Sequence, residues 1–438
     1  MNDKPKVLII SSANPLNGPG RLGLDAWLAF KDAGYSCDLL TKYKVPQYPD
    51  ILYIKKEKFA SNALIKKVIK KIVDCIKIIQ GKYCKLYYPY CFFYKTEQNP
   101  PEDSQKILKK LTHKYELVLI YFWQEMLSFQ SIEAIYDKLM CQIHFMAVDY
   151  SHMSGGCHFT GDCERYQTGC GYCKAISSII PNDFTANNVM YRKQIYEKVR
   201  PVVHGNTYMH QFYRKSYLLK NYDRIGISFP IINSNIFYRM DEKPLRQKYK
   251  IPESKKFVIF FGSQNVSDTR KGMTYLLNAL DILYGQLDNN ERSIIHLLIA
   301  GKSIDSIKKR LKFSYTYVNF VPNSQLPELY SIANVFISPS INDAGPMMVN
   351  QSIMCGTPVI GFEMGALLDV IKNKGTGFCA DFKDSKDLAL CIDKVFRLKI
   401  QSPSAYCEMR NKCRLLALET SSPKVFVDTI IEYYYKYK

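Results

Sequence analysis

Short apolar strands alternate with helical segments in two separate series, and this rhythm constrains the fold more than any other feature of the sequence. The first series opens with an expected strand at 6–12, a turn-rich loop, a helix at about 21–32 and a strand near 37–41. The second series starts again with a buried strand at 257–261 and a helix at 272–284. Because such alternation is typical of parallel sheets, we expect an α/β chain with two Rossmann-like domains.

A linker separates the two series where the pattern changes, and its centre is Pro230–Asn235. A length of 438 residues suits two or three domains. We therefore expect an N-terminal domain over 1–228, a C-terminal domain over 229–404 and C-terminal helices over 405–438 that cross back to the first domain. The parallel sheets should face an inter-domain cleft, because ligands in these folds bind at the carboxyl ends of the strands.

The chain is strongly basic, with 60 Lys and Arg against 40 Asp and Glu and a formal charge of +20. Such a charge attracts nucleic acid, anionic lipid or phosphorylated ligands. The sequence has no RRM, KH or zinc-finger pattern, so nucleic acid is not an expected partner. It also has no apolar run near the roughly 18 residues of a membrane span and no signal peptide pattern, so we expect a cytoplasmic protein.

The most specific signal lies where a strand of the second series is followed by a helix that starts near Pro346. Proline suits a first helical position, because its missing N–H would have no partner there. The free amides of Met347 and Met348 then form a seat for a diphosphate at the helix N-terminus. Asp343 stands just before this position, and Gln351 lies inside the helix. Taken alone, the segment also fits an ordinary strand–helix unit of an α/β fold.

The spacing of this segment resembles the signature of glycosyltransferase family 4, the retaining GT-B transferases of bacterial polysaccharide synthesis. That signature is Glu-x7-Glu followed by Gly-x-Pro-Val-Ile. Asp343 and Gln351 stand at its two acidic positions, and Gly356–Ile360 read Gly-Thr-Pro-Val-Ile. In the family the first acid contacts the donor sugar and the second contacts the nucleotide ribose. Here the first side chain is one methylene shorter, and the second is an uncharged amide that still hydrogen-bonds.

A second match to the family lies upstream, at Arg270-Lys271-Gly272. In the family a Lys-Gly pair after this strand binds the donor diphosphate, so the role carries over to Lys271, with Arg270 as a second cation. Cations stabilise the negative charge that grows on a leaving diphosphate. The alternative is a solvated helix N-terminus, although cations are unfavourable there without an anion. The resemblance covers about residues 226–395 and implies a GT-B fold with its donor site in the C-terminal domain.

The N-terminal half carries weaker signals. The resemblance places Gly18 and Gly20 in a glycine loop that faces the donor, although a Gly-x-Gly loop is more often only a turn. Asp149 matches the acid of a His-Asp pair in the family, whose histidine is replaced by Val148. We expect His152 to supply the lost contact, and the alternative is a surface histidine. The expected catalytic residues are thus Asp149 and His152, together with the Asp343 already named.

Four cysteines fall within 17 residues, at Cys157, Cys163, Cys170 and Cys173. Thiolates this close in sequence can bind a structural zinc tetrahedrally, and a subset of the family has the same cluster. Only one Cys-x2-Cys pair is present, so buried free thiols and disulfides formed outside the cell stay open. The resemblance implies no metal or other cofactor in the chemistry itself.

Residues 62–80 have the apolar spacing of an amphipathic helix whose other face is basic. A basic amphipathic face suits an anionic membrane surface, and a solvated domain helix is the alternative. The lysines of this face are Lys66, Lys67, Lys70, Lys71 and Lys77.

Together these features predict a retaining glycosyltransferase. By resemblance it moves a sugar from a nucleotide-sugar donor to a glycan or lipid-linked glycan acceptor, at the inner face of the cytoplasmic membrane, in capsule or lipopolysaccharide synthesis. One alternative is another GT-B enzyme, such as a nucleotide-sugar epimerase or a phosphorylase, although no pyridoxal phosphate motif is recognisable. The other is a non-catalytic basic protein that binds membrane or nucleic acid through a degenerate GT-B fold.

Overall fold

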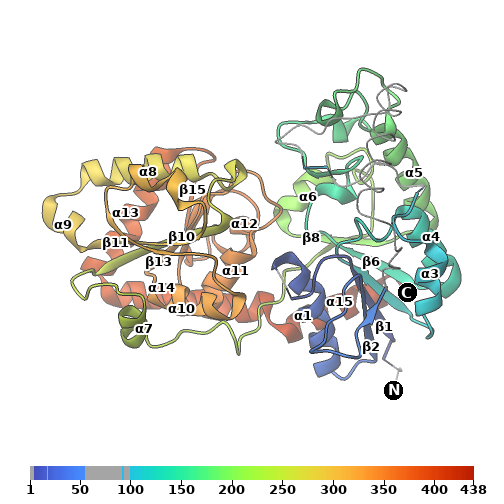
Figure 1. Cartoon of the computed structure of the whole chain (residues 1–438), viewed down its shortest axis with the longest axis horizontal. Coiled ribbons are helices and arrows are strands. Elements are labelled where there is room, and N and C mark those ends of the chain that lie inside the picture. The colour runs from blue at the N-terminus through green and yellow to red at the C-terminus, as the bar shows by residue number, and fades with distance from the viewer. Residues whose placement is uncertain (1–3, 17, 55–90, 93–98) are drawn as a thin grey trace, which may run out of the picture. The chain divides into compact units, whose positions relative to one another are not determined.

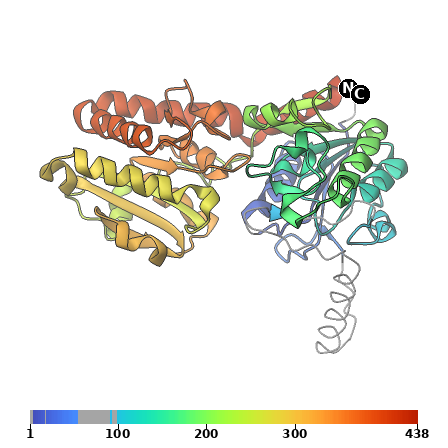
Figure 2. The ribbon, with the colours of Figure 1, turned by 90° about the horizontal axis from the view of Figure 1, so that it is seen from above.

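The computed structural model describes residues 4–16, 18–54, 91–92 and 99–438 (Figure 1). The chain forms two compact units. The first unit comprises Met1–His204, Gln211–Gly226 and Tyr433–Lys438, and the second comprises Gly205–His210 and Ile227–Glu432. Both chain ends therefore belong to the first unit, where Figures 1 and 2 mark them. The amphipathic segment 62–80 lies outside the described residues.

A seven-stranded sheet forms the centre of the first unit, in the order β3-β2-β1-β5-β6-β8-β9. The register recorded for β1, β2, β3, β5, β6 and β8 is parallel throughout. Its central strands are apolar runs with both faces buried, as a parallel sheet between helices requires. The strands are β1 (Val7–Ser11), β2 (Cys37–Thr41), β3 (Leu52–Tyr53), β5 (Leu117–Ile120), β6 (Gln142–Met146), β8 (Val202–Gly205) and β9 (Ile225–Ile227).

Helices with clear start signals connect these strands. The Asp183 carboxylate accepts hydrogen bonds from the first N–H groups of α5, and Ser128 forms a capping box at the start of α4. A small antiparallel pair, β4 (Cys91–Phe92) and β7 (Cys157–Phe159), stands apart from the main sheet. Among the described residues, the helices of this unit are α1 (Arg21–Asp32), α3 (Ser104–Lys110), α4 (Phe129–Leu139) and α5 (Phe184–Val199), and α6 (Thr207–Tyr213) is divided between the two units.

The second unit is built on a six-stranded sheet in the order β12-β11-β10-β13-β14-β15, with every pair parallel. Side chains of its central strand β10 alternate between two cores, because successive residues of a strand point to opposite faces. Phe257 and Ile259 join one core, and Val258 and Phe260 join the other. The strands are β10 (Phe257–Asn265), β11 (Ile295–Lys302), β12 (Ser314–Val318), β13 (Val335–Ser338), β14 (Val359–Phe362) and β15 (Gly377–Ala380).

Helices cover both faces of this sheet. Helices α8 (Met273–Gln286) and α13 (Ser385–Gln401) pack into one core, while α10 (Leu326–Ile332), α11 (Met347–Met354) and α14 (Pro403–Ser421) pack into the other. The two parallel sheets confirm the predicted α/β class. The remaining helices are α7 (Glu242–Lys248), α9 (Asn289–Ile294), α12 (Leu367–Val370) and α15 (Pro423–Lys436).

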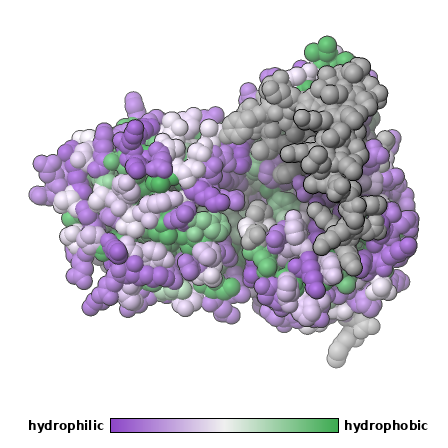
Figure 3. Space-filling view, viewed as in Figure 1, coloured by the Kyte–Doolittle hydropathy of each residue, from purple (hydrophilic) through white to green (hydrophobic). Residues whose placement is uncertain are grey.

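In Figure 3 most of the coloured surface is hydrophilic, and apolar residues are scattered among the hydrophilic ones. Within the described ranges, every helix is too short or too polar to span a membrane.

Candidate functional site

Two loops meet at the carboxyl edge of the second sheet. One follows β10 and includes the short 3-10 turn Thr269–Lys271, and the other follows β13. Because β10 and β13 are neighbouring parallel strands, their loops emerge at the same edge. The Ile341 N–H donates to the Arg270 carbonyl oxygen at 2.8 Å. A Cβ atom on Gly272, whose φ is +66°, would lie 1.7 Å from the Pro339 carbonyl oxygen, so glycine is what allows this contact.

An ion pair joins the two loops. The Lys271 Nζ atom lies 2.5 Å from the Asp343 Oδ2 atom, and the other carboxylate oxygen accepts the Gly345 N–H at 3.1 Å. Burial alone would raise the pKa of Asp343, but the charge and hydrogen bond of Lys271 hold that pKa below its ordinary value. Asp343 is therefore a buried, ionised carboxylate beside a partly exposed cation.

The second expected cation, Arg270, has a carboxylate of its own. Its Nη2 atom lies 2.7 Å from Asp268 Oδ2, and the other Asp268 oxygen accepts the Arg270 N–H at 3.0 Å. The charge of Arg270 also contributes to the low pKa of Asp343. The structure thus brings both predicted cations to the site, with Lys271 in direct contact with the predicted donor-sugar residue.

Helix α11 begins beside this ion pair. Its first residue is Met347. Pro346, which was expected at the first helical position, stands directly before the helix and has an extended backbone. Among the described residues, no side chain caps the helix, so its first N–H groups are available for an anion. The preceding loop is fixed from another element, because Asn206 Nδ2 donates to the Ala344 carbonyl oxygen at 2.7 Å.

Gln351 lies inside α11 with both ends of its amide engaged. The Nε2 atom donates to Asn323 Oδ1 at 3.1 Å, and the Oε1 atom accepts from the Tyr330 hydroxyl at 3.2 Å. Gln351 is buried, whereas Asn323 is exposed. The amide is therefore oriented from both sides and linked to the surface through Asn323.

Asn350 is a residue that sequence reasoning missed. It is 1% exposed, and neither polar atom of its amide has a hydrogen-bond partner in the described part of the chain. Its signal in the sequence is a polar side chain next to Gln351, on a helix that otherwise packs into the core.

In the first unit, Asp149 follows β6 and is fully buried. Its Oδ1 atom accepts the Ser151 N–H at 2.7 Å, and its Oδ2 atom lies 2.7 Å from His158 Nδ1. Burial would raise the pKa of Asp149, but His158 and the hydrogen bonds hold it below its ordinary value. His158 is thus the histidine that the structure pairs with Asp149, and the sequence analysis assigned it no role.

His152 is not placed as expected. Its ring lies in the core, with centroids 4.6 Å from Trp123 and 5.2 Å from Phe145. It is fully buried, and its ring nitrogens have no hydrogen-bond partner among the described residues. Burial lowers the pKa of His152 to about 4, so the ring is neutral at physiological pH. The proposed catalytic contact of His152 is therefore corrected, because no ligand reaches a side chain packed in this way.

The glycine loop after β1 has a local explanation. Gly18–Gly20 forms a 3-10 turn directly before α1. A Cβ atom on Gly20 would lie 1.9 Å from the Asn14 carbonyl oxygen, so the loop itself requires glycine there. A donor contact of Gly18 and Gly20 stays a prediction.

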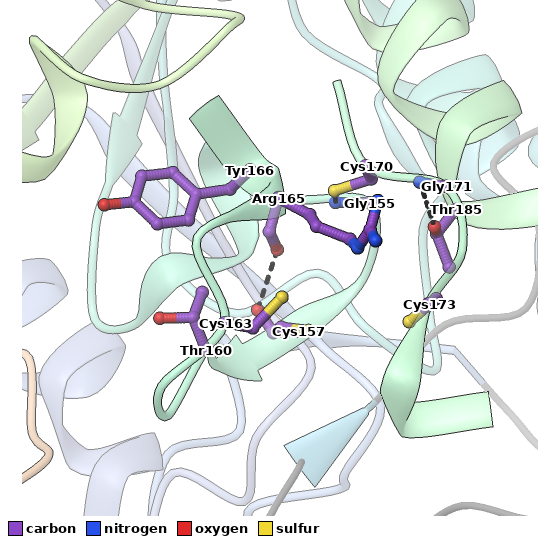
Figure 4. Close-up of a pocket in the computed structure, with 11 residues that line it drawn as sticks. Gly155, Cys157, Thr160, Cys163, Arg165, Tyr166, Cys170, Gly171, Cys173 and Thr185 are labelled. Carbon is purple, nitrogen blue, oxygen red and sulfur yellow. Dashed lines mark hydrogen bonds between the residues drawn. The ribbon is translucent and has the colours of Figure 1, made fainter. Parts of the chain in front are cut away.

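The four clustered cysteines line one pocket together with Arg165, Tyr166 and Thr185 (Figure 4). Burial raises the pKa of Cys157, and it raises that of Cys170 to about 12. Arg165 lines the same pocket, and its guanidinium lies over the Tyr172 ring, 5.1 Å from the ring centroid. Within the described residues, no group of three or more His, Cys, Asp or Glu side chains is arranged to hold a metal ion. The geometry gathers free thiols around a cavity and does not support the expected zinc site.

Comparison with known proteins agrees with the geometry at the carboxyl edge. Residues 241–414, which contain Lys271, Asp343 and Gln351, match the sequence model of the glycosyl transferases group 1. The matched segment, residues 241–414, belongs to this family. The group 1 transferases are the retaining GT4 enzymes that the sequence resembled, so that resemblance is confirmed.

Curated relatives are distant. An uncharacterised glycosyltransferase of Methanocaldococcus jannaschii is 22% identical over 274 residues, which cover 59% of this chain and 66% of that protein. The human alpha-1,3/1,6-mannosyltransferase is 26% identical over 199 residues, which cover 42% of this chain and 46% of that protein. The matches therefore span about two thirds of the first of these proteins and less than half of the second.

Solved structures extend the similarity to the whole fold. Sucrose-phosphate synthase from Thermosynechococcus elongatus has a TM-score of 0.64 at 16% identity, with 99% of each chain covered. WaaG, a glycosyltransferase involved in lipopolysaccharide biosynthesis, has a TM-score of 0.59 at 13% identity, with 96% of this chain and 98% of that chain covered. These neighbours confirm the GT-B fold expected of a group 1 transferase.

Proposed function

We propose that the chain is a retaining glycosyltransferase that moves a sugar from a nucleotide-sugar donor to a glycan acceptor. The observation that carries this proposal is the contact between Lys271 and Asp343 beside the start of α11. A cation and uncapped N–H groups match a diphosphate, and a neighbouring carboxylate matches sugar hydroxyl groups. A nucleotide sugar combines these groups in one molecule.

Each residue has a role in this proposal. Lys271 and Arg270 hold the diphosphate and stabilise the charge that grows on it as the glycosidic bond breaks. The amides of Met347 and Met348 bind the same phosphates, and Pro346 directs the chain into the helix. Asp343 orients the donor sugar, while Gln351 hydrogen-bonds the ribose. Members of the family typically need no metal for the transfer.

The relatives suggest where to begin with substrates. Anabaena HepE, whose crystal structure contains UDP-glucose, has a TM-score of 0.61 at 12% identity, with 99% of this chain and 100% of that chain covered. A 41.2 kDa Klebsiella pneumoniae protein from a cps region is 23% identical over 171 residues, which cover 39% of this chain and 44% of that protein. We propose a lipid-linked glycan as acceptor and surface polysaccharide synthesis, of capsule or lipopolysaccharide type, as the setting.

The test is a panel of nucleotide sugars, UDP-glucose first, incubated with and without n-octyl glycosides and analysed by mass spectrometry. Transfer, or slow donor hydrolysis without acceptor, supports the proposal. Lys271→Met should lose this activity, while Lys309→Met, which changes an exposed lysine of the same unit, should keep it. A changed nucleotide sugar formed without acceptor would indicate an epimerase. Tight nucleotide or lipid binding without any turnover would indicate a non-catalytic protein.

We propose that the enzyme acts at the inner face of the cytoplasmic membrane. The basic segment 62–80 supports this, because each lysine near an anionic surface adds about 1 kcal/mol of attraction. Binding to anionic vesicles should fall when Lys66, Lys67, Lys70 and Lys71 are changed to Gln, and nucleotide affinity should not. Equal vesicle binding by both proteins would refute a membrane role for this segment.

A further inference from the structure

One peptide group lies between Asp343 and a side chain that comes from the earlier half of the sequence. The N–H of this peptide, which belongs to Gly345, donates to Asp343 Oδ1 at 3.1 Å. Its carbonyl oxygen, which belongs to Ala344, accepts from Asn206 Nδ2 at 2.7 Å. Because a trans peptide is planar, its N–H and C=O point in opposite directions. Asn206 therefore holds the peptide from one side while Asp343 binds it from the other, and all four residues belong to the second unit.

Asn206 is itself fixed by its neighbours. Its Oδ1 atom accepts the Met209 N–H at 2.9 Å, which caps the start of α6. The next residue, Thr207, donates its N–H to Asp369 Oδ2 of α12 at 3.2 Å. A flipped amide would put oxygen against the Ala344 carbonyl oxygen and nitrogen against the Met209 N–H. The hydrogen-bond network therefore determines which end of the amide faces the donor loop.

The two carboxylate oxygens of Asp343 are supported separately. Lys271 contacts Oδ2 at 2.5 Å from the loop after β10, while the Gly345 N–H holds Oδ1. Asn206 acts on the second of these supports, because its bond to the carbonyl oxygen fixes the plane of the peptide. The same bond polarises the peptide and strengthens its N–H as a donor. The direction of Oδ1 thus depends on Asn206, whereas the ammonium that would meet a diphosphate is placed by another loop.

We propose that Asn206 is a positioning residue of the transfer, which directs the Asp343 carboxylate at the donor sugar through the Ala344–Gly345 peptide. This inference rests on the proposed function, in which Asp343 orients the sugar and Lys271 holds the diphosphate. Loss of the Asn206 bond should disturb the sugar and spare the diphosphate. A displacement of about 1 Å near reacting groups can lower a rate by about 100-fold. A merely structural residue would alter stability without separating kcat from affinity for the diphosphate.

Neutral capping residues separate the two contacts of the Asn206 amide. In Asn206→Ser the hydroxyl still accepts the Met209 N–H, but it is one bond shorter and does not reach the Ala344 carbonyl oxygen. Asn206→Thr is a second variant of this kind, should the first be unstable. Asn206→Ala loses the helix cap as well as the bond to the donor loop. The matched control is Asn290→Ser, which changes an exposed asparagine of the same unit.

The probes are the nucleotide sugar that is turned over fastest in the panel and its nucleoside diphosphate, which is UDP for UDP-glucose. For Asn206→Ser we expect kcat to fall at least about tenfold. The fall should appear in transfer to n-octyl glycosides and in acceptor-independent donor hydrolysis, because both reactions break the same bond. Calorimetric titration should give wild-type affinity for the nucleoside diphosphate. Asn206→Ala should match the kcat of Asn206→Ser but unfold at a lower urea concentration, and Asn290→Ser should behave as wild type.

Wild-type kcat in a folded Asn206→Ser or Asn206→Thr protein would overturn the inference alone, because Asp343 would then need no support from this side. A diphosphate affinity that falls by as much as kcat would also overturn it, since Asn206 would then only maintain the general shape of the site. Wild-type protein that turns over no nucleotide sugar would overturn the proposed function, and this inference with it.

Discussion

The Lys271 ammonium lies 2.5 Å from the Asp343 carboxylate, although the two residues are 72 positions apart in the sequence. Lys271 is the main cation that compensates the charge of the Asp343 carboxylate, and both residues stand beside the uncapped start of α11. A diphosphate that binds there competes with Asp343 for the same ammonium. Donor binding would then leave the carboxylate oriented by the Gly345 N–H and able to accept hydrogen bonds from the sugar.

A double-mutant cycle tests this contact. Lys271→Met leaves a buried carboxylate without its nearest cation, so the free energy of unfolding should fall by about 1–2 kcal/mol, less than for a fully buried pair because Lys271 is 28% exposed. Adding Asp343→Asn should recover part of this loss. Donor affinity should fall at least about tenfold in Lys271→Met, since a charged hydrogen bond contributes about 1.5–3 kcal/mol. Urea unfolding and calorimetric titration measure both effects, and additive losses would contradict the pair.

Gln351→Glu restores the acidic residue of the family pattern. The new carboxylate still accepts from the Tyr330 hydroxyl, and the exposed Asn323 amide can turn to donate to it. We expect retained or higher nucleotide affinity, because a charged acceptor strengthens a hydrogen bond from a ribose hydroxyl. Calorimetric titration with UDP compares the variant with wild type and with Gln351→Leu, which should bind more weakly. A folded Gln351→Glu protein that no longer binds would place Gln351 away from the ribose.

Asn350→Leu removes a buried amide with no partner among the described residues and replaces it with an apolar side chain of similar volume. An unsatisfied buried polar group costs about 1–3 kcal/mol, so the variant should be more stable. For a unit of this size, thermal unfolding should shift upward by about 2–4 °C for each kcal/mol. A lower midpoint would show that the amide is paired in solution, by ordered water or by a ligand of the site.

His152→Phe should make the protein less sensitive to acid. The histidine titrates near pH 6.5 when unfolded and at about 4 when folded, so the unfolded state binds the extra proton in this range. Stability from this residue is therefore complete above pH 6.5 and falls as the pH drops toward 4, by up to about 3 kcal/mol. Urea unfolding from pH 4 to 8 should show a shallower slope for the variant, with transferase activity retained at pH 7.5. Lost activity in a stable variant would return His152 to the site.

The cysteine pocket predicts purified protein without stoichiometric zinc. Within the described residues, no group of three or more His, Cys, Asp or Glu side chains is arranged to hold a metal ion, so the thiols are not placed as a ligand set. Elemental analysis should find well under one zinc per chain, and a chelator should leave the unfolding temperature unchanged. One zinc per chain, lost together with stability in Cys170→Ser, would show that the four thiols converge when metal is supplied.

Much of the fold follows from local pattern. Strands such as β1 and β10 are uninterrupted apolar runs, and the rule that parallel strands end at one edge already brings Lys271 toward Asp343. The family spacing between Asp343 and Gln351 then gives the helix between them. These features are predictable because they depend on periodicity and on topology that the periodicity determines.

The loop after β6 shows what local pattern does not determine. His152 and His158 lie in one short glycine-containing segment, and either could have paired with Asp149. The choice depends on Trp123 and Phe145, which enclose His152, and on β7, which carries His158. The spacing of the four cysteines likewise suits a metal. The pocket that these cysteines line, however, depends on how α5 and the loop before it pack. Such outcomes need tertiary contacts that no spacing rule contains.

The path of the chain between the two units has a consequence for recombination. The chain passes between them four times, because Gly205–His210 belongs to the second unit and Tyr433–Lys438 to the first. A chimera made with another family member at a single splice point near residue 228 would contain two hybrid units, not one exchanged half. Its second unit would keep the native Asn206 against a foreign Ala344 loop, and its first unit would receive a foreign C-terminal end. Exchange of donor preference by recombination therefore requires both segments of the second unit, Gly205–His210 and Ile227–Glu432, to be exchanged together.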